Sequence, residues 1–436
     1  MNVGCIPKKM MHTAALLGEA RKDQEAFGWP KFEGKHSWSK MVQGINAKIQ
    51  SMNRGYESQL KSKLVDYYNA LGSFVDKHTI SVRHHPHHHH HHHHNNIHKN
   101  THTHTQITYG DGKKETKTTR FVIVAVGGRP TQLYCEGKEH AITSDDIFWR
   151  QTSPGKTLCV GASYVALECA GFLTGIGLDT TVMVRSIPLR GYDLEIANRI
   201  VEYMEKSHTK FIRSATPSKI EKLSNGMLRV HYEENKYKTA PGKEDSHQRP
   251  KGSNGYIDVD TVLAAIGRYP DTKGLNLEAV GIKTNRKGEI FTDNADCSNV
   301  DNIFAIGDCA VGRPELTPVA IQAGKMLARR LVGQSKRLMD YARVATTVFT
   351  PIEYGSVGEP EDNFMTKTSS GPYVILLSRS QSYHHPKLFI NTGTIRTPPR
   401  RFSTSDFRTV SKSIVQRSHL WSGISRRSVR NNPSVT

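Results

Sequence analysis

The sequence predicts an α/β fold with a mostly parallel sheet, and three observations carry this prediction. Residues 157–160 (TLCV) and 180–184 (TTVMV) are short apolar runs, and the segment between them, SYVALECAGFL, has a helical pattern, so the three form a βαβ unit. Residues 259–266 and 303–306 repeat the strand pattern, and each run ends at a glycine. Residues 315–331 combine apolar residues at helical spacing with a proline near the expected first turn. Strands that alternate with helices in this way indicate a sheet covered by helices.

The first third of the chain adds one strand and one helix. Residues 119–126 (TRFVIVAV) form an apolar, β-branched run that predicts a buried strand, closed by a tight loop at 127–130. Residues 10–20 (MMHTAALLGEA) predict a helix that begins close after Cys5.

The chain is strongly basic, and much of the excess lies at one end. Its 436 residues carry a formal net charge of +20, and residues 363–436 supply +11 of it from twelve Lys and Arg and one Asp. A nucleic-acid-binding arm is one interpretation of this tail, and an unstructured tail is the other. We expect the unstructured tail, because no sustained period and no aromatic interleaving accompanies the charges.

Cysteine usage and hydropathy bear on the compartment. Six Cys in a chain of this length are too few for a disulfide scaffold, and no two lie within four residues of each other, so the CxxC spacing is absent. No apolar run reaches the ~18 residues of a membrane span, and residues 1–20 lack the pattern of a signal peptide. We therefore expect a soluble, intracellular protein.

A histidine-rich segment interrupts the first part of the chain. Residues 84–104 contain 13 of the 23 His. Such low complexity buries too little apolar surface to offset its ordering entropy, which predicts a disordered insert. The tract can bind Zn, Ni or Cu ions adventitiously, or it is a passive expansion of a loop, and it lacks the ligand spacing of a structural metal site.

Residues 160–172 (VGASYVALECAGF) lie where a dinucleotide-binding glycine motif belongs, after a strand and at the start of a helix. Gly161 can form the tight turn and Ala166 allows close helix packing, but Ser163 replaces the middle glycine of G-x-G-x-x-G/A, so this match alone is weak. Ser163 does not fit a hydrolase nucleophile, because Val165 stands where G-x-S-x-G requires its second glycine.

The second strand of the βαβ unit strengthens the nucleotide interpretation. It is followed by Arg185, 24 residues after Gly161, where an NAD-binding unit has an acid for the ribose hydroxyls. Arg185 and Arg190 instead suit a 2′-phosphate, which favours NADP. The alternative is two exposed arginines at a strand end.

Cys5 has the setting of a reactive cysteine. Lys8 and Lys9 within one turn, together with the start of a helix, would stabilise its thiolate, which is the nucleophilic form. A buried structural cysteine is the alternative.

Six motifs occur in a fixed order: GCIPKK, GASYVALECAGFL, VMVRSIPLRGYD, AIGR, AIGDC and ELTPVAIQAG. In this order they resemble the high-molecular-weight thioredoxin reductases of animals, including the thioredoxin-glutathione reductases, and less closely the glutathione reductases. All are pyridine nucleotide-disulfide oxidoreductases. The resemblance spans about residues 1–362 and is interrupted by the histidine tract.

The resemblance implies two Rossmann-like domains in a three-layer α/β arrangement, one for FAD and one for NAD(P). It divides the chain into a remnant of the FAD domain (1–140), an NADPH domain (141–271), a second part of the FAD domain (272–345), the start of a dimerisation domain (346–362) and the basic tail (363–436). The first Rossmann-like domain is expected to be incomplete and the C-terminal interface domain degraded.

The resemblance also implies roles for single residues. Cys5 matches the flavin-proximal cysteine of the redox pair, and Lys8 and Glu168 match a catalytic pair beside the flavin. Tyr164 matches the aromatic residue that covers the nicotinamide pocket. The other FAD-contacting positions are Gly4, Ile6, Pro7, Leu71, Gly72, Val126, Gly127, Asp308, Glu315, Leu316 and Thr317. The other NADPH positions are Gly161, Ala162, Ser163, Val165, Ala166, Arg185, Ser186, Arg190, Ile266, Gly267 and Arg268. No metal site is implied.

Departures from the family pattern lead us to expect a fragment. The partner of Cys5 in the motif Cys-Val-Asn-Val-Gly-Cys, and the FAD-binding glycine motif, would precede Met1. Val126 replaces a threonine of the family's Ala-Thr-Gly loop. Because the resemblance ends after Glu361, we expect the dimer-forming domain with its catalytic His-Pro pair, and the redox tail, to be absent. We expect both the flavin step and the acceptor step to be compromised in the chain as written.

The expected function is that of an FAD-dependent NADPH:disulfide oxidoreductase, most like thioredoxin-disulfide reductase, in cell redox homeostasis. The expected acceptor is thioredoxin or glutathione disulfide, and the family forms homodimers, although the dimer interface is expected to be lost here. A glutathione-disulfide reductase and a non-catalytic, His-rich, basic protein that binds metal or nucleic acid are the alternatives. We expect no nucleic acid, no membrane and a cytoplasmic location, with a mitochondrial form left open.

Overall fold

A five-stranded parallel sheet with its crossover helices forms the centre of the computed structural model, which describes residues 2–84, 114–234, 254–358, 374–382 and 385–393. The strand order is β6-β13-β7-β8-β9, and each neighbouring pair is parallel. The strands are β6 (Ile142–Thr143), β7 (Thr157–Val160), β8 (Thr180–Val184), β9 (Lys210–Arg213) and β13 (Thr261–Ala264). The predicted βαβ unit is present as β7, helix α4 (Tyr164–Gly175) and β8, which confirms the α/β fold class.

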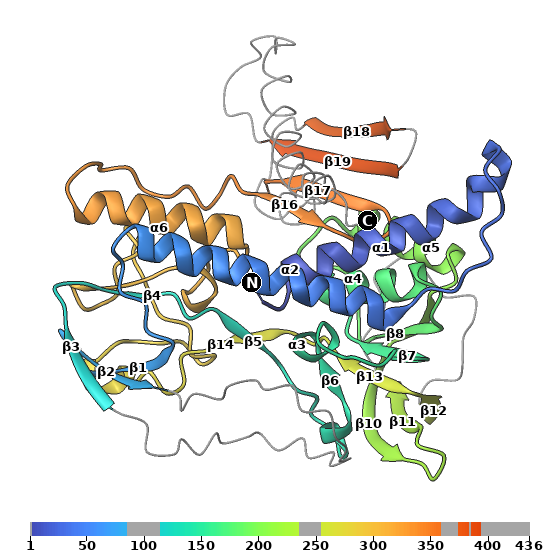
Figure 1. Cartoon of the computed structure of the whole chain (residues 1–436), viewed down its shortest axis with the longest axis horizontal. Helices are drawn as coiled ribbons and strands as arrows, with labels where there is room; N and C mark the ends of the chain where they lie inside the picture. The colour runs from blue at the N-terminus through green and yellow to red at the C-terminus, as the bar shows by residue number, and fades with distance from the viewer. Residues whose placement is uncertain (1, 85–113, 235–253, 359–373, 383–384, 394–436) are drawn as a thin grey trace, which may run out of the picture.

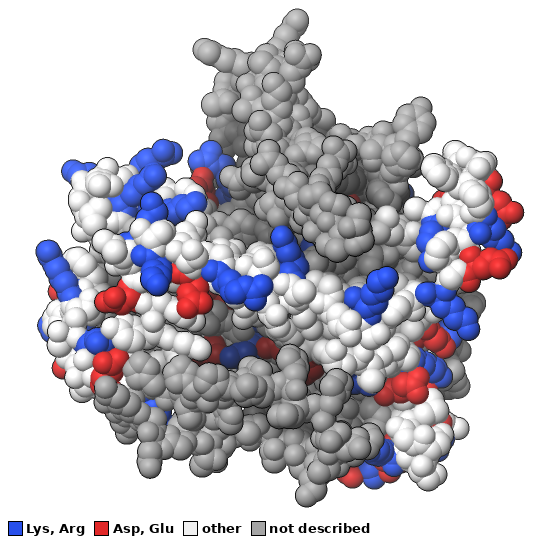
Figure 2. All heavy atoms as spheres, viewed as in Figure 1, with Lys and Arg blue, Asp and Glu red and all other residues white. Residues whose placement is uncertain are grey.

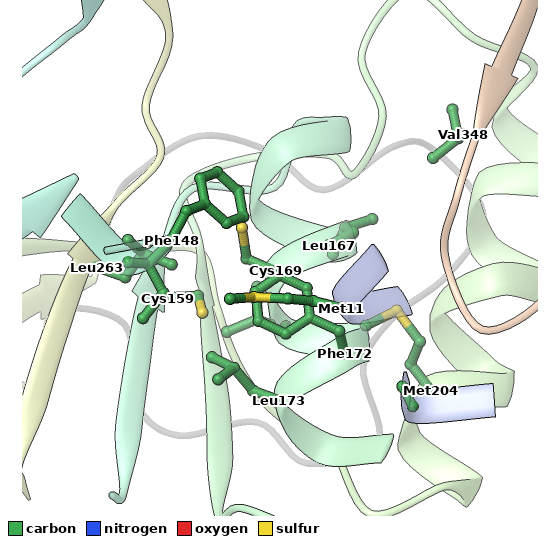
Figure 3. Close-up of a cluster of buried hydrophobic side chains, with 14 of the residues drawn as sticks. Met11, Phe148, Cys159, Leu167, Cys169, Phe172, Leu173, Met204, Leu263 and Val348 are labelled. Atoms are coloured by element: carbon green, nitrogen blue, oxygen red, sulfur yellow. The ribbon is translucent and has the colours of Figure 1, made fainter. Parts of the chain in front are cut away.

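Different layers cover the two faces of this sheet (Figure 1). On one face lie helices α1 (Cys5–Asp23), α2 (Trp38–Ser62), α4 and α5 (Leu194–Lys206), whose buried side chains form one cluster with the sheet. The other face packs against an antiparallel sheet of β10 (Ala215–Lys222), β11 (Leu228–Glu234) and β12 (Asn254–Val259). In Figure 3 the side chains of Met11, Phe172 and Met204 meet in the helical cluster.

Helices α1 and α4 approach each other unusually closely because small residues line their contact. A Cβ atom on Gly18 would lie 2.5 Å from the carbonyl oxygen of Gly175, and one on Gly175 would lie 2.6 Å from the Cβ of Ala15. Real Cβ atoms do not come so close to other atoms, so glycine is required at both positions. This contact fixes the first residues of the chain against the helix that follows the glycine turn.

Smaller elements join distant parts of the chain. Strands β1 (Ala70–Asp76), β2 (Thr79–His84) and β3 (Lys114–Thr118) form an antiparallel sheet. β4 (Val122–Val124) pairs in parallel with β15 (Ile303–Ala305), and β5 (Gly128–Pro130) pairs with β14 (Arg268–Pro270). Two further α-helices are present, α3 (Ser144–Ile147) and α6 (Thr317–Leu331). There are also short 3-10 helices, which are η1 (Gln24–Phe27), η2 (Lys138–His140), η3 (Leu277–Val280) and η4 (Gly307–Cys309).

Several predicted boundaries differ from the structure. The strand expected over 119–126 is reduced to β4, and part of the following loop is β5. The run 259–266 is divided between β12 and β13, because the chain passes from one sheet to the other at Asp260. The first helix begins at Cys5, directly after Gly4, whose φ of 92° lies in the left-handed region.

The expectation of an unstructured tail is wrong for two segments. β18 (Val374–Ser382) and β19 (His385–Gly393) pair with each other and extend a sheet that also contains β16 (Ala345–Val348) and β17 (Glu353–Val357). β18 begins inside the apolar run 372–377, the one part of the tail with strand character. Residues 394–436 lie outside the described residues, as does the histidine tract except His84, which ends β2.

Charges of both signs are interspersed on the described surface. Figure 2 shows basic and acidic side chains side by side on the face that carries α1, α2 and α6. Among the described helices, none is long and apolar enough to cross a membrane.

Candidate functional site

The first turn of α1 presents one exposed cysteine and buries the residues that follow it. Cys5 is the first helical residue and is exposed, whereas Ile6, Pro7 and Lys8 are buried. The alternative of a buried structural cysteine is therefore wrong. Lys8 and Lys9, which follow in the same turn, both form ion pairs with carboxylates.

Lys8 forms a buried ion pair with Glu168 on α4. Its Nζ lies 2.7 Å from Oε1 of Glu168, and the two side chains are only 10% and 2% exposed. The same carboxylate oxygen accepts a hydrogen bond of 2.7 Å from the backbone N–H of Phe349. The ring of Phe349 lies 4.5 Å from Lys8 Nζ, so the ammonium contacts both a carboxylate and an aromatic face.

A second group of charges adjoins this pair. Lys9 Nζ lies 2.6 Å from Glu353 Oε1, and Nε2 of His12 donates to the same oxygen over 3.1 Å. His12 is buried, and desolvation lowers the pKa of its imidazole despite the hydrogen bond to Glu353, which raises it. Burial therefore favours the neutral form of the imidazole.

Two tyrosines lie beside the Lys8–Glu168 pair. Burial raises the pKa of Tyr164, and the charges of Glu315, Glu168 and Cys5 act in the same direction. Burial likewise raises the pKa of Tyr192 to about 12, with a further contribution from Glu168. Tyr164 is the first residue of α4 and precedes Glu168 by one turn of the same helix.

The turn between β7 and α4 has a backbone that only glycine can form. Gly161 has φ of 123°, and a Cβ there would lie 2.2 Å from the carbonyl oxygen of Ala265. Ala162 and Ser163 complete the turn, Tyr164 begins α4, and Ala166 is fully buried. The backbone N–H groups of the first turn of α4 therefore lie close after a glycine turn, as in nucleotide-binding units.

The loop after β8 folds back onto this turn. The backbone N–H of Leu189 donates to the carbonyl of Ala162 over 2.8 Å, and Leu189 is buried. Arg185 and Arg190 are both exposed, and Arg190 donates to the hydroxyl of Ser186 over 2.7 Å. The three residues assigned to the 2′-phosphate thus share one short loop.

A group of polar residues lies where β15 and α6 meet. Asp308 is half-buried, and this burial raises the pKa of its carboxyl although the nearby Arg268 lowers it. Glu315 is exposed, but the protein atoms packed around its carboxyl, and then the charge of Asp308, raise its pKa. Leu316 caps α6 and Thr317 is its first residue. Arg268 also donates to the carbonyl of Gly128 over 2.5 Å.

The remaining predicted positions have accessible apolar or glycine surface. The exposed fractions of Leu71, Val126 and Ile266 are 46%, 40% and 37%, which is high for large apolar residues. Gly127 and Gly267 have φ of 72° and 135°, conformations that favour glycine. Gly72 lies in β1 and is exposed.

Sequence patterns gave no signal for two residues of this region. Phe349, in the β16–β17 turn, contacts Lys8, and Glu353, the first residue of β17, contacts Lys9, but neither residue belongs to a quoted motif. No group of His, Cys, Asp and Glu suited to a metal ion occurs among the described residues. A cavity of about 240 Å³ at the end of α6, lined by Met326, Arg337 and other residues, contains none of the predicted site residues.

The parallel sheet, the glycine turn at Gly161 and the arginine loop define an α/β protein of the dinucleotide-binding class. The family model of the pyridine nucleotide-disulphide oxidoreductases matches residues 1–324, and the chain belongs to this family. It is 43% identical over 371 residues to Thioredoxin reductase SEP1 of Emiliania huxleyi, a match that covers 83% of this chain and 67% of the relative.

Proposed function

We propose that the chain acts as an FAD-dependent NADPH:disulfide oxidoreductase of the thioredoxin reductase type, as the similar protein from Emiliania huxleyi is named, with the flavin and acceptor steps weakened as the departures from the family pattern predict. The observation that carries the proposal is the Lys8–Glu168 pair, because it joins the helix that begins at Cys5 to the helix that follows the Gly161 turn. A cysteine, an ammonium group and a nucleotide-binding turn are thereby held in one place.

The described residues fit a flavin dinucleotide. Leu71 and Val126 expose apolar surface that bound FAD would cover. The backbone at Gly127 allows close approach, and the half-buried carboxyl of Asp308 can accept hydrogen bonds from ribityl or ribose hydroxyls. FAD, when bound, would supply hydride transfer from NADPH and the passage of electrons to a disulfide.

The residues of this chain would divide the work. Arg185 and Arg190 would bind the 2′-phosphate of NADPH, and Tyr164 would cover the nicotinamide pocket. Lys8, oriented by Glu168, would present a fixed positive charge to the flavin ring. Cys5 is exposed, so a disulfide can reach its sulfur.

The domain boundaries, the location, the subtype and the electron acceptor belong to the same proposal. Residues 1–140 and 272–345 would form the flavin part, 141–271 the NADPH part and 346–362 the start of a dimerisation domain, in a cytoplasmic protein of the animal high-molecular-weight type. Thioredoxin is the proposed acceptor because of the similarity to a thioredoxin reductase, and glutathione disulfide is the second candidate.

The colour of the purified chain tests the proposal against the metal- or nucleic-acid-binding alternative. A yellow protein with flavin absorbance after incubation with FAD is the expected result. A colourless protein that retains metal, or whose affinity for DNA falls steeply with salt, would favour the alternative.

A further inference from the structure

Two carboxylates lie where the β16–β17 turn approaches the first turns of α1. Glu168 on α4 and Glu353 at the start of β17 each bind two groups through a single oxygen. Glu168 Oε1 is shared by Lys8 Nζ and the backbone N–H of Phe349, each at 2.7 Å. Glu353 Oε1 is shared by Lys9 Nζ at 2.6 Å and His12 Nε2 at 3.1 Å. The ring of Phe349 lies between the two sets, 4.5 Å from Lys8 Nζ and 4.0 Å from Lys9 Nζ.

The turn is also fixed independently of these charges. A Cβ on Gly171, one turn after Glu168, would lie 2.7 Å from Cδ of Pro351, so the turn packs directly on α4. Thr350 is fully buried, and its hydroxyl donates to the carbonyl of Ile352 over 2.7 Å. The turn is therefore a rigid support that reaches α1 and α4 together.

Lys8 and Lys9 are adjacent in sequence and contact the same aromatic ring, so each must be matched to its own carboxylate. Both ammonium groups contact the ring of Phe349, and the side chain of Glu168 is only 2% exposed. If no carboxylate bound Lys9, its ammonium would repel that of Lys8 or compete with it for Glu168. Glu353, with its side chain 14% exposed, supplies that carboxylate to Lys9.

We propose that Glu353 is a positioning residue that binds Lys9 and thereby keeps Glu168 for Lys8. It acts through Lys9 and has no role of its own in bond making or breaking. The inference rests on the proposed function only for what Lys8 does beside the flavin, whereas the assignment of the two lysines is a property of the chain itself.

Amine labelling of the full-length chain without added flavin tests the assignment. The probe is acetic anhydride, and peptide fragment masses separate the acetylation rate of Lys8 from that of Lys9. Glu353→Gln should accelerate both residues, and Lys8 by at least about threefold, as coupling between members of one charge network implies. Lys9→Met should leave Lys8 slow. Lys9→Met combined with Glu353→Gln should return Lys8 to its slow rate, because the ammonium that Glu353 binds is then also removed.

The control has the same change of charge at an exposed pair. Glu205→Gln removes the partner that Arg213 contacts at 2.7 Å, with both side chains more than a third exposed, and it should change neither lysine. Acceleration of Lys9 alone in Glu353→Gln would overturn the proposal. Equal acceleration of Lys8 in the single and double variants would also overturn it, because that would show general loosening of the turn.

The test remains decisive even if a variant does not fold. If Glu353→Gln does not fold, the double variant should fold, since it also removes the ammonium that Glu353 binds. An unfolded double variant would contradict the proposal. Failure to bind FAD would count against the proposed function and leave the labelling result intact, so the two outcomes are distinguishable.

Discussion

Glu168→Gln should destabilise the protein strongly, because it leaves the ammonium of Lys8 buried without its carboxylate. Breaking a buried ion pair by removal of one partner costs about 3–5 kcal/mol. The Phe349 ring, 4.5 Å from Lys8 Nζ, retains a cation–π contact worth about 0.5–2 kcal/mol. Glutamine oxygen can still accept from the Phe349 N–H, so we expect the low end of the range, about 3 kcal/mol, or roughly 100-fold in the unfolding constant.

Urea unfolding followed by tryptophan fluorescence measures this change. For a slope of about 3 kcal/mol per molar urea, the midpoint should fall by about 1 M at unchanged slope. Lys8→Met combined with Glu168→Gln should recover much of the loss, because no buried charge remains. A midpoint of Glu168→Gln close to that of the wild type would refute the view that the Lys8 ammonium depends on this carboxylate.

Three further predictions concern the nucleotide turn, its arginines and the buried histidine. Replacing Arg185 and Arg190 with Ala should weaken NADPH binding by about 1.5–3 kcal/mol for each lost contact and leave NADH nearly unchanged in calorimetry; equal losses would contradict the phosphate assignment. Gly161→Ala should lower stability by about 2–5 kcal/mol in urea unfolding, since its Cβ would lie 2.2 Å from a carbonyl oxygen, and an unaffected variant would show that the turn can move. Because burial lowers the pKa of His12, the unfolded chain binds more protons, so stability should fall as pH drops below about 6.5; His12→Phe should flatten this dependence, and an unchanged slope would contradict it.

The parallel sheet was predictable because its signals are local. The runs at 157–160 and 180–184 are bounded by polar residues and glycine, and they became β7 and β8 with the same bounds. The run at 259–266 was wrongly predicted to be a single strand, because strands of two different sheets follow each other there with one residue between them. Nothing in a short apolar run indicates that the chain changes sheets.

The surroundings of the site were less predictable for a related reason. Lys8 and Glu168 could be paired only through the resemblance, because 160 residues separate them in sequence. The contact of Lys9 with Glu353 spans 344 residues, and Glu353 belongs to none of the six motifs. The strands β18 and β19 were not predicted, because the pattern of their own residues is weak. Pairing of β19 with β17 and with β18 gives this segment its order.

Anaerobic reduction of the FAD-incubated chain by NADPH tests the central claim most directly. The account predicts that NADPH bleaches the flavin absorbance, and does so faster than the same concentration of NADH, because Arg185 and Arg190 share the loop that folds onto the Gly161 turn. A chain that retains FAD but is bleached by neither nucleotide, or equally fast by both, would contradict it.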